Sequence, residues 1–263
     1  MAEFGKEDLS GSTFDWTDLS GSTFRFASMS DTTIRDTDLY RVRMRGVELM
    51  DVDISGEIRG LRVNGVDVTD YVEQELVRRD PLLGRLRPDD RDGFLTAWDE
   101  LERLWEGTVA RARALDPSQL DESVDDEWSF IQTLRHLMFA TSAWVNRAVL
   151  GEAQPFHPLA LPWESAPALS DLGLTIDARP SLDEVQTLRR ERQADVRRVL
   201  DGLTEEQLAS TVTPEGEGWP PPRPVAVKEC LHVVLNEEYW HRQYAERDLA
   251  VLESRTQDAH REE

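Results

Sequence analysis

The residues best suited to chemistry in this sequence are histidines and carboxylates that share helix faces. His136 lies in an apolar stretch, TLRHLMF, and His232 and His241 lie in a second one, HVVLNEEYWH. Glu237 and His241 are four residues apart, so a helix would place them on one face, on a stripe with apolar residues. A carboxylate and an imidazole on a core-facing stripe must be compensated. Metal coordination is one way and hydrogen bonding between helices is another, and spacing alone leaves both open.

The remaining histidines fit such a site poorly. His232 precedes His241 by nine residues, and nine steps of about 100° put the two rings on opposite helix faces. His157 lies in a proline-flanked loop and His260 in the polar C-terminal segment, and neither has partner spacing.

Several neighbouring residues are candidates for substrate binding, and each has a structural alternative. Trp128 starts a helical stretch, where Ser129 is a candidate cap. Trp240 would line a pocket or pack in the core. Arg242 would bind a substrate carboxylate or pair within the protein, and the same two alternatives apply to Arg135 beside His136.

The overall composition narrows the class of protein. The 263 residues carry a net charge of −22, which disfavours a nucleic-acid or anionic-membrane surface. One cysteine, Cys230, excludes an intramolecular disulfide and fits a reducing compartment. The sequence has no run of 18 apolar residues. Its first residues contain no apolar h-region, so we expect no signal peptide. We therefore expect a cytoplasmic protein that binds neither membranes nor nucleic acid.

Most of the chain predicts helices, which would position the candidate residues. A short helix is expected after residue 68, capped by Thr69 or Asp70. Four long amphipathic helices are expected over about residues 90–115, 125–150, 180–203 and 226–254. Ser181 and Glu184 form a capping box, and Gly151 is a C-terminal glycine signal. Four long helices with one long connection predict a four-helix bundle.

The N-terminal residues follow a different period. Every fifth residue from Phe4 to Ile54 is apolar, and a second register of mostly small or β-branched residues runs beside it. Neither a helix nor a strand has this period. The segment over about residues 2–56 resembles the pentapeptide-repeat family, which implies a right-handed quadrilateral β-helix of fewer than three coils with a buried apolar column. An Asn-Gly pair at Asn64 then predicts a hairpin.

The helical part resembles a second family. WSFIQTLRHL, followed far downstream by NEEYWHRQYAERDL, is similar to the DinB-like four-helix family. That family includes mycothiol-dependent enzymes such as maleylpyruvate isomerase and thiol S-transferases, and the similarity covers about residues 88–252. The resemblance implies a divalent metal held by His136, Glu237 and His241. Many members have histidine at the middle position, and Glu237 matches the mycothiol-dependent branch.

The two resemblances together predict an α+β multidomain chain. We expect a β-helix and hairpin over residues 1–70, a DinB-like four-helix bundle over 71–252 and a frayed polar tail over 253–263.

Two functions remain open on the sequence. The first is a transferase or isomerase in which Zn²⁺, Ni²⁺ or Fe²⁺ activates a low-molecular-weight thiol, such as mycothiol, against an electrophile. The thiol would be a cosubstrate, because Cys230 is expected to be a small buried residue. The second is a non-catalytic binding protein whose acidic repeat segment is an interaction or DNA-mimic surface. Residues 1–70 carry 14 acidic and 8 basic residues, which permits this function. A homodimer is compatible with either function.

Overall fold

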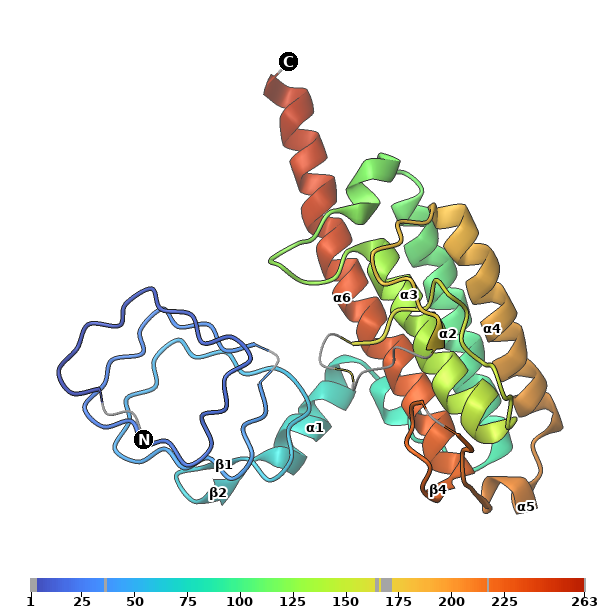
Figure 1. The fold of residues 1–263 in the computed structure, drawn as a ribbon, viewed down its shortest axis with the longest axis horizontal. Coiled ribbons are helices and arrows are strands. Elements are labelled where there is room, and N and C mark those ends of the chain that lie inside the picture. The colour runs from blue at the N-terminus through green and yellow to red at the C-terminus, as the bar shows by residue number, and fades with distance from the viewer. Residues whose placement is uncertain (1–3, 36, 164–165, 167–171, 217, 263) are drawn as a thin grey trace. The chain divides into compact units, whose positions relative to one another are not determined.

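The computed structural model describes residues 4–35, 37–163, 166, 172–216 and 218–262 (Figure 1), with side chains described up to residue 256. The chain divides into two compact units, Met1–Gly56 and Glu57–Glu263. Each unit is described separately below.

The first unit turns a corner every five residues. Its backbone adopts a positive φ at each described corner, a conformation that glycine adopts without strain and other residues adopt rarely. The corners lie at Lys6, Gly11, Trp16, Gly21, Phe26, Asp31, Arg41, Gly46, Asp51 and Gly56. The five-residue period of the sequence is therefore a period of the backbone.

The same unit does not bury the apolar column that the sequence predicts. The large side chains of that register, from Phe4 to Ile54, are 41–64% exposed. No strand is assigned in the described residues 4–35 and 37–56, and Figure 1 shows an open coil. Fewer than three coils leave few neighbours to cover these side chains. The quadrilateral β-helix therefore stays a prediction.

The second unit begins with the expected hairpin. Strands β1 (Arg62–Val63) and β2 (Val66–Asp67) pair antiparallel. Asn64 and Gly65 both have positive φ, as a tight type I′ turn requires. Helix α1 (Thr69–Arg79) follows, but neither Thr69 nor Asp70 caps it, because the N-cap position falls on Val68. The Thr69 hydroxyl instead accepts a hydrogen bond from the Leu61 amide.

The remaining elements are mostly helical. They are η1 (Leu83–Arg85), α2 (Arg91–Ala112), η2 (Pro117–Asp121), α3 (Phe130–Thr141), the π-helical η3 (Ser142–Val149), α4 (Leu182–Gly202), α5 (Glu205–Leu208), the antiparallel pair β3 (Thr211–Val212) and β4 (Val225–Ala226), and α6 (Val227–Glu262). Among the described residues, no helix has both the length and the apolar character needed to cross a membrane.

Local signals mark the starts of three of the long helices. The side chains of Asp90, Ser129 and Ser181 accept hydrogen bonds from backbone amides at the starts of α2, α3 and α4. Ser129 and Ser181 complete capping boxes with Gln132 and Glu184. The expected start of the second long helix near residue 125 was therefore about five residues too early.

The C-terminal segment, expected to be a polar tail, is assigned to a helix. Helix α6 continues to Glu262, because no glycine or proline interrupts it. Its extension contacts η2 and the residue after it, where Gln119 donates to the Thr256 hydroxyl at 2.9 Å and Arg255 lies 3.8 Å from Glu122. The side chain of His260 lies outside the described residues.

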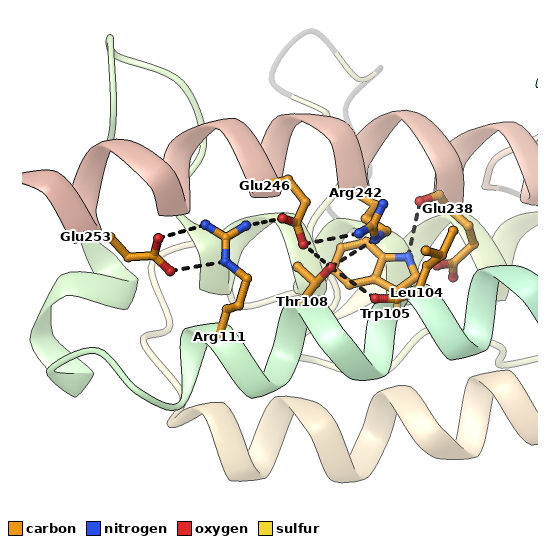
Figure 2. A network of polar contacts seen from close by, with 8 residues as sticks. All are labelled: Leu104, Trp105, Thr108, Arg111, Glu238, Arg242, Glu246 and Glu253. Carbon is orange, nitrogen blue, oxygen red and sulfur yellow. Dashed lines mark hydrogen bonds and ion pairs between the residues drawn. The ribbon is translucent and has the colours of Figure 1, made fainter. Parts of the chain in front are cut away.

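Helices α2, α3 with η3, α4 and α6 form the helical bundle (Figure 1). Apolar side chains on α2 face its interior at the predicted spacing, including Phe94, Trp98, Leu101 and Trp105. Polar contacts join α2 to α6 along their length (Figure 2), where Arg111 bridges Glu246 and Glu253.

An ion pair inside the bundle joins α4 to α6. The Arg189 guanidinium donates to both carboxylate oxygens of Glu238, at 3.0 and 2.6 Å, and both side chains are 2% exposed. Arg189 also lies over the Trp105 ring, 4.6 Å from its centroid, and the Trp105 Nε1–H donates to the Glu238 carbonyl. The pair is thus held by three helices.

Replacing one partner of this ion pair should reduce the free energy of unfolding more than replacing both partners with apolar residues. Arg189→Met or Glu238→Leu alone leaves an unpaired buried charge, and each should reduce the free energy of unfolding by about 3–5 kcal/mol. The double variant should lose less than either single variant. Urea unfolding of all four proteins measures this coupling, and additive losses would contradict it.

Candidate metal centre

Two helices bring His136, Glu237 and His241 together. His136 comes from α3, and Glu237 and His241 come from consecutive turns of α6. One donor atom from each side chain lies within 4.8 Å of the other two. Glu237 Oε2 is 3.4 Å from His136 Nε2 and 3.2 Å from His241 Nδ1. The three side chains predicted from the sequence to bind a metal therefore form one cluster.

Backbone carbonyls select the tautomer of both rings. His136 Nδ1 lies 3.0 Å from the Leu161 carbonyl, and His241 Nδ1 lies 3.0 Å from the Glu237 carbonyl. A carbonyl oxygen only accepts, so in each neutral ring Nδ1 carries the proton. Nε2 is then the unprotonated nitrogen of both rings, and this is the form in which histidine binds a metal.

The charges of the cluster are unbalanced. Burial raises the pKa of Glu237, but the contact with His136 and the charges of the two histidines outweigh it and leave the pKa below its usual value. Burial, aided by the charge of His136, lowers the pKa of His241 to about 4. At neutral pH an ionised carboxylate therefore faces a neutral His241 imidazole. Glu237 Oε2 is buried and makes no hydrogen bond of good geometry.

The next residue shows how a carboxylate in this core is otherwise satisfied. Glu238 has a bidentate arginine partner, whereas Glu237 has two imidazoles. A divalent cation would supply the missing positive charge and bind the buried carboxylate oxygen together with one nitrogen of each histidine ring. Two neutral histidines and one carboxylate suit Zn²⁺, Ni²⁺ or Fe²⁺ and leave coordination positions open. The residues present therefore fit a divalent metal ion.

Aromatic rings surround the cluster. The Trp128 ring centroid lies 4.5 Å from that of His136 and 6.0 Å from that of His241. Tyr244, 40% exposed, contacts His241 edge-on at 5.8 Å, and Arg247 lies over the Tyr244 ring. Trp128 is thus the predicted substrate-binding residue that the structure places at the cluster.

The structure places Arg242 and Trp240, two further substrate-binding candidates, elsewhere. Arg242 donates to the Thr108 hydroxyl at 2.9 Å and to Glu246 at 3.3 Å, within the contacts between α2 and α6 (Figure 2). Trp240 is 37% exposed and packs against Tyr239. Neither has a described contact with the three clustered side chains.

The remaining candidates take structural roles. His232 stacks on Phe94 and contacts the Pro88 carbonyl at 2.8 Å, away from the cluster. His157 Nδ1 accepts from the Leu159 amide within its own loop. Cys230 is fully buried, and burial raises the pKa of its thiol to about 12. The thiol of Cys230 is therefore protonated at neutral pH.

One contributor was not anticipated from the sequence. The connection between η3 and α4 was expected only to link two helices, yet its Leu161 carbonyl contacts His136. The sequence shows only a short apolar run, PLALP, in this loop, and the structure buries its Ala160 and Leu161. A backbone carbonyl has no sequence signature, so this contact could not have been assigned.

Comparison with known families identifies the family of the helical unit. Residues 100–245 match the model of the DinB superfamily. The match spans more than half of the chain. The chain belongs to the DinB superfamily. All three clustered residues lie within the matched range of this DinB superfamily member.

A second family covers the N-terminal unit. Residues 8–56 match pentapeptide repeats in eight copies, which confirms the repeat identified from the five-residue period. Comparison of this DinB superfamily chain with curated proteins and with solved structures finds no match.

Metal content tests the cluster directly. The wild type, loaded with Zn²⁺ or Ni²⁺ and desalted, should retain about one ion per chain. His136→Ala and His241→Ala each remove one of three ligands and should lose it, and Glu237→Gln should weaken binding at least tenfold. Elemental analysis and equilibrium dialysis measure both quantities.

The matched control is His232→Gln, which changes a histidine on the other face of α6. It should retain the ion. Loss of metal from this control, or no metal in the wild type, would contradict the assignment.

The metal-free protein should also lose stability in mild acid because of His241. Its pKa is about 4 when folded, against 6.5 as the ordinary value, so the unfolded chain binds the proton first and folding weakens as pH falls from 6.5 toward 4. Between pH 7 and 5 this contributes about 2 kcal/mol. Urea unfolding with a chelator should show a smaller loss in His241→Asn than in the wild type, and equal losses would contradict it.

Proposed function

We propose that this protein is a divalent-metal-dependent transferase or isomerase that uses a low-molecular-weight thiol, with mycothiol as the thiol that the family resemblance suggests. The observation that carries the proposal is the cluster of His136, Glu237 and His241, whose donor atoms lie within 4.8 Å. Membership of the DinB superfamily, in which metal binding is common, supports it.

His136 and His241 would hold the ion through Nε2, and Glu237 through its buried carboxylate oxygen. An ion bound there lowers the pKa of a coordinated thiol and so supplies a thiolate nucleophile near neutral pH. The donor set carries one negative charge, so the loaded centre keeps a net charge of +1. That charge favours an anionic sulfur over a neutral one.

The surrounding residues would orient the reactants. The Trp128 ring lies against both histidines and offers an apolar face that keeps water from one side of the centre. Tyr244 is partly exposed beside His241 and would contact the arriving substrate. The electrophile would then lie next to the thiolate sulfur, as transfer to carbon requires.

The attacking thiol would come from a cosubstrate. Cys230 is inaccessible, and a thiol with a pKa of about 12 gives almost no thiolate at neutral pH. This leaves the open coordination positions for a small external thiol.

Thiol transfer tests the proposal. The Zn²⁺- or Ni²⁺-loaded wild type should accelerate conjugation of mycothiol, or of another small thiol, to a chromogenic electrophile. His241→Ala should reduce the rate at least a hundredfold, because the ion is lost. Trp128→Ala should keep the ion but raise KM. Trp240→Ala, the matched tryptophan outside the cluster, should match the wild type.

Activity that survives in His241→Ala and in metal-free protein would contradict a role for the metal. A loaded wild type that transfers none of the thiols would contradict the reaction class while leaving the metal centre intact.

A non-catalytic binding role for the repeat unit is the second candidate function. Its large apolar side chains are exposed and its composition is acidic, and exposed apolar patches favour association. These apolar side chains would be covered if the repeat unit closed into a β-helix. They would also be covered if the repeat units of two chains paired. Failure of the wild type to bind Zn²⁺ or Ni²⁺ would favour this candidate over the enzyme.

A further inference from the structure

Arg135, the residue before His136, holds two arms of the connection between η3 and α4. Its side chain is almost fully buried, and four of its N–H groups donate to backbone carbonyls. Nε bonds Leu159 at 2.8 Å, and the terminal nitrogens bond Thr175, Ile176 and Ala178 at 2.7–2.9 Å. The planar guanidinium therefore clamps residues 159 and 175–178 together.

The first arm also meets α3 through two further hydrogen bonds. The Leu161 amide donates to the Arg135 carbonyl at 3.1 Å, and His136 Nδ1 donates to the Leu161 carbonyl at 3.0 Å. Three hydrogen bonds thus link Arg135 and His136 to a stretch of three residues, 159–161. The position of the Leu161 carbonyl depends on this stretch.

We propose that Arg135 is a positioning residue for the metal centre: by clamping the connection it keeps the Leu161 carbonyl on His136 Nδ1, so that Nε2 is the unprotonated nitrogen facing Glu237 and His241. The metal-binding part of this inference rests on the proposed function. The tautomer part does not, because it concerns the protein without metal.

The chemistry of the clamp requires an arginine. Arginine offers five N–H groups in a fixed plane, and here four of them reach carbonyls on two separate arms. Lysine has three donors on one nitrogen and cannot span both arms. With one arm released, the ring of His136 loses its fixed acceptor and both neutral tautomers become populated.

Arg147 provides a matched control. It lies in η3, is also buried, and donates to the backbone carbonyls of Glu215 and of Gly216, the latter at 2.8 Å. These residues belong to a different loop, and none of them contacts His136. Arg147→Met therefore removes a comparable buried clamp without touching the Leu161 carbonyl.

The experiment compares Arg135→Met, Arg135→Lys and Arg147→Met with the wild type. Long-range ¹H–¹⁵N spectra of metal-free, ¹⁵N-labelled protein report which nitrogen of His136 carries the proton, and Zn²⁺ affinity is measured by competition with a chelator. The wild type and Arg147→Met should show the Nδ1–H form. Both Arg135 variants should show mixed tautomers, with Zn²⁺ affinity reduced about 10–100-fold.

The outcomes separate the two proposals. If a folded Arg135→Lys keeps the Nδ1–H form and wild-type affinity, Arg135 only stabilises the fold and the inference is wrong. This variant decides the question if Arg135→Met does not fold. If Arg147→Met changes the tautomer as much, the effect is not specific and the inference is also wrong. If the wild type binds no Zn²⁺ but Arg135 variants shift the tautomer, the tautomer part of the inference stands, whereas its metal-binding part and the proposed function fail.

Discussion

The constraint on which this bundle depends is that α6 turns two consecutive carboxylates toward its interior. Glu238 is neutralised by Arg189 of α4 through a bidentate pair. Glu237 clusters with His136 and His241, and burial keeps His241 neutral at ordinary pH. A charge in a poorly solvated site requires an opposite charge. Helix α6 therefore contains one carboxylate, Glu238, that an arginine neutralises, and one, Glu237, that a bound cation would neutralise.

Different sets of polar residues on α6 contact different helices. Arg242, Glu246 and Glu253 bond across to α2 (Figure 2). Glu238 meets α4, and Glu237 with His241 meets α3. Each step along a helix turns about 100°, so neighbours in sequence have different partners in space. The two structural networks hold the helix that carries two of the three donors.

Periodicity and capping signals predicted much of this architecture, and helix geometry explains why. Helix α4 begins at the capping box that the sequence indicates at Ser181, whereas α3 begins at its cap Ser129, later than its expected start near residue 125. The spacing of Glu237 and His241 placed them on one face, and the family resemblance supplied His136 from a distant helix. Arg242 shows the limit: its position beside His241 suggested a shared site, but its side chain bonds Thr108 instead. Which of two adjacent faces a long side chain reaches depends on the neighbouring helix.

The part that sequence could not supply is made of backbone atoms. The acceptor for His136 Nδ1 is a carbonyl, which every residue has, and Leu161 lies 25 residues further along the chain. The Leu161 carbonyl lies in a connection whose sequence has no repeating pattern. The Arg135 side chain holds this connection by donating hydrogen bonds to four other carbonyls in it. Carbonyls inside a regular helix already accept a helix hydrogen bond, and the Glu237 carbonyl can orient His241 because both lie in α6. For His136 and Arg135 the acceptors come from a separate segment, and the irregular connection supplies them.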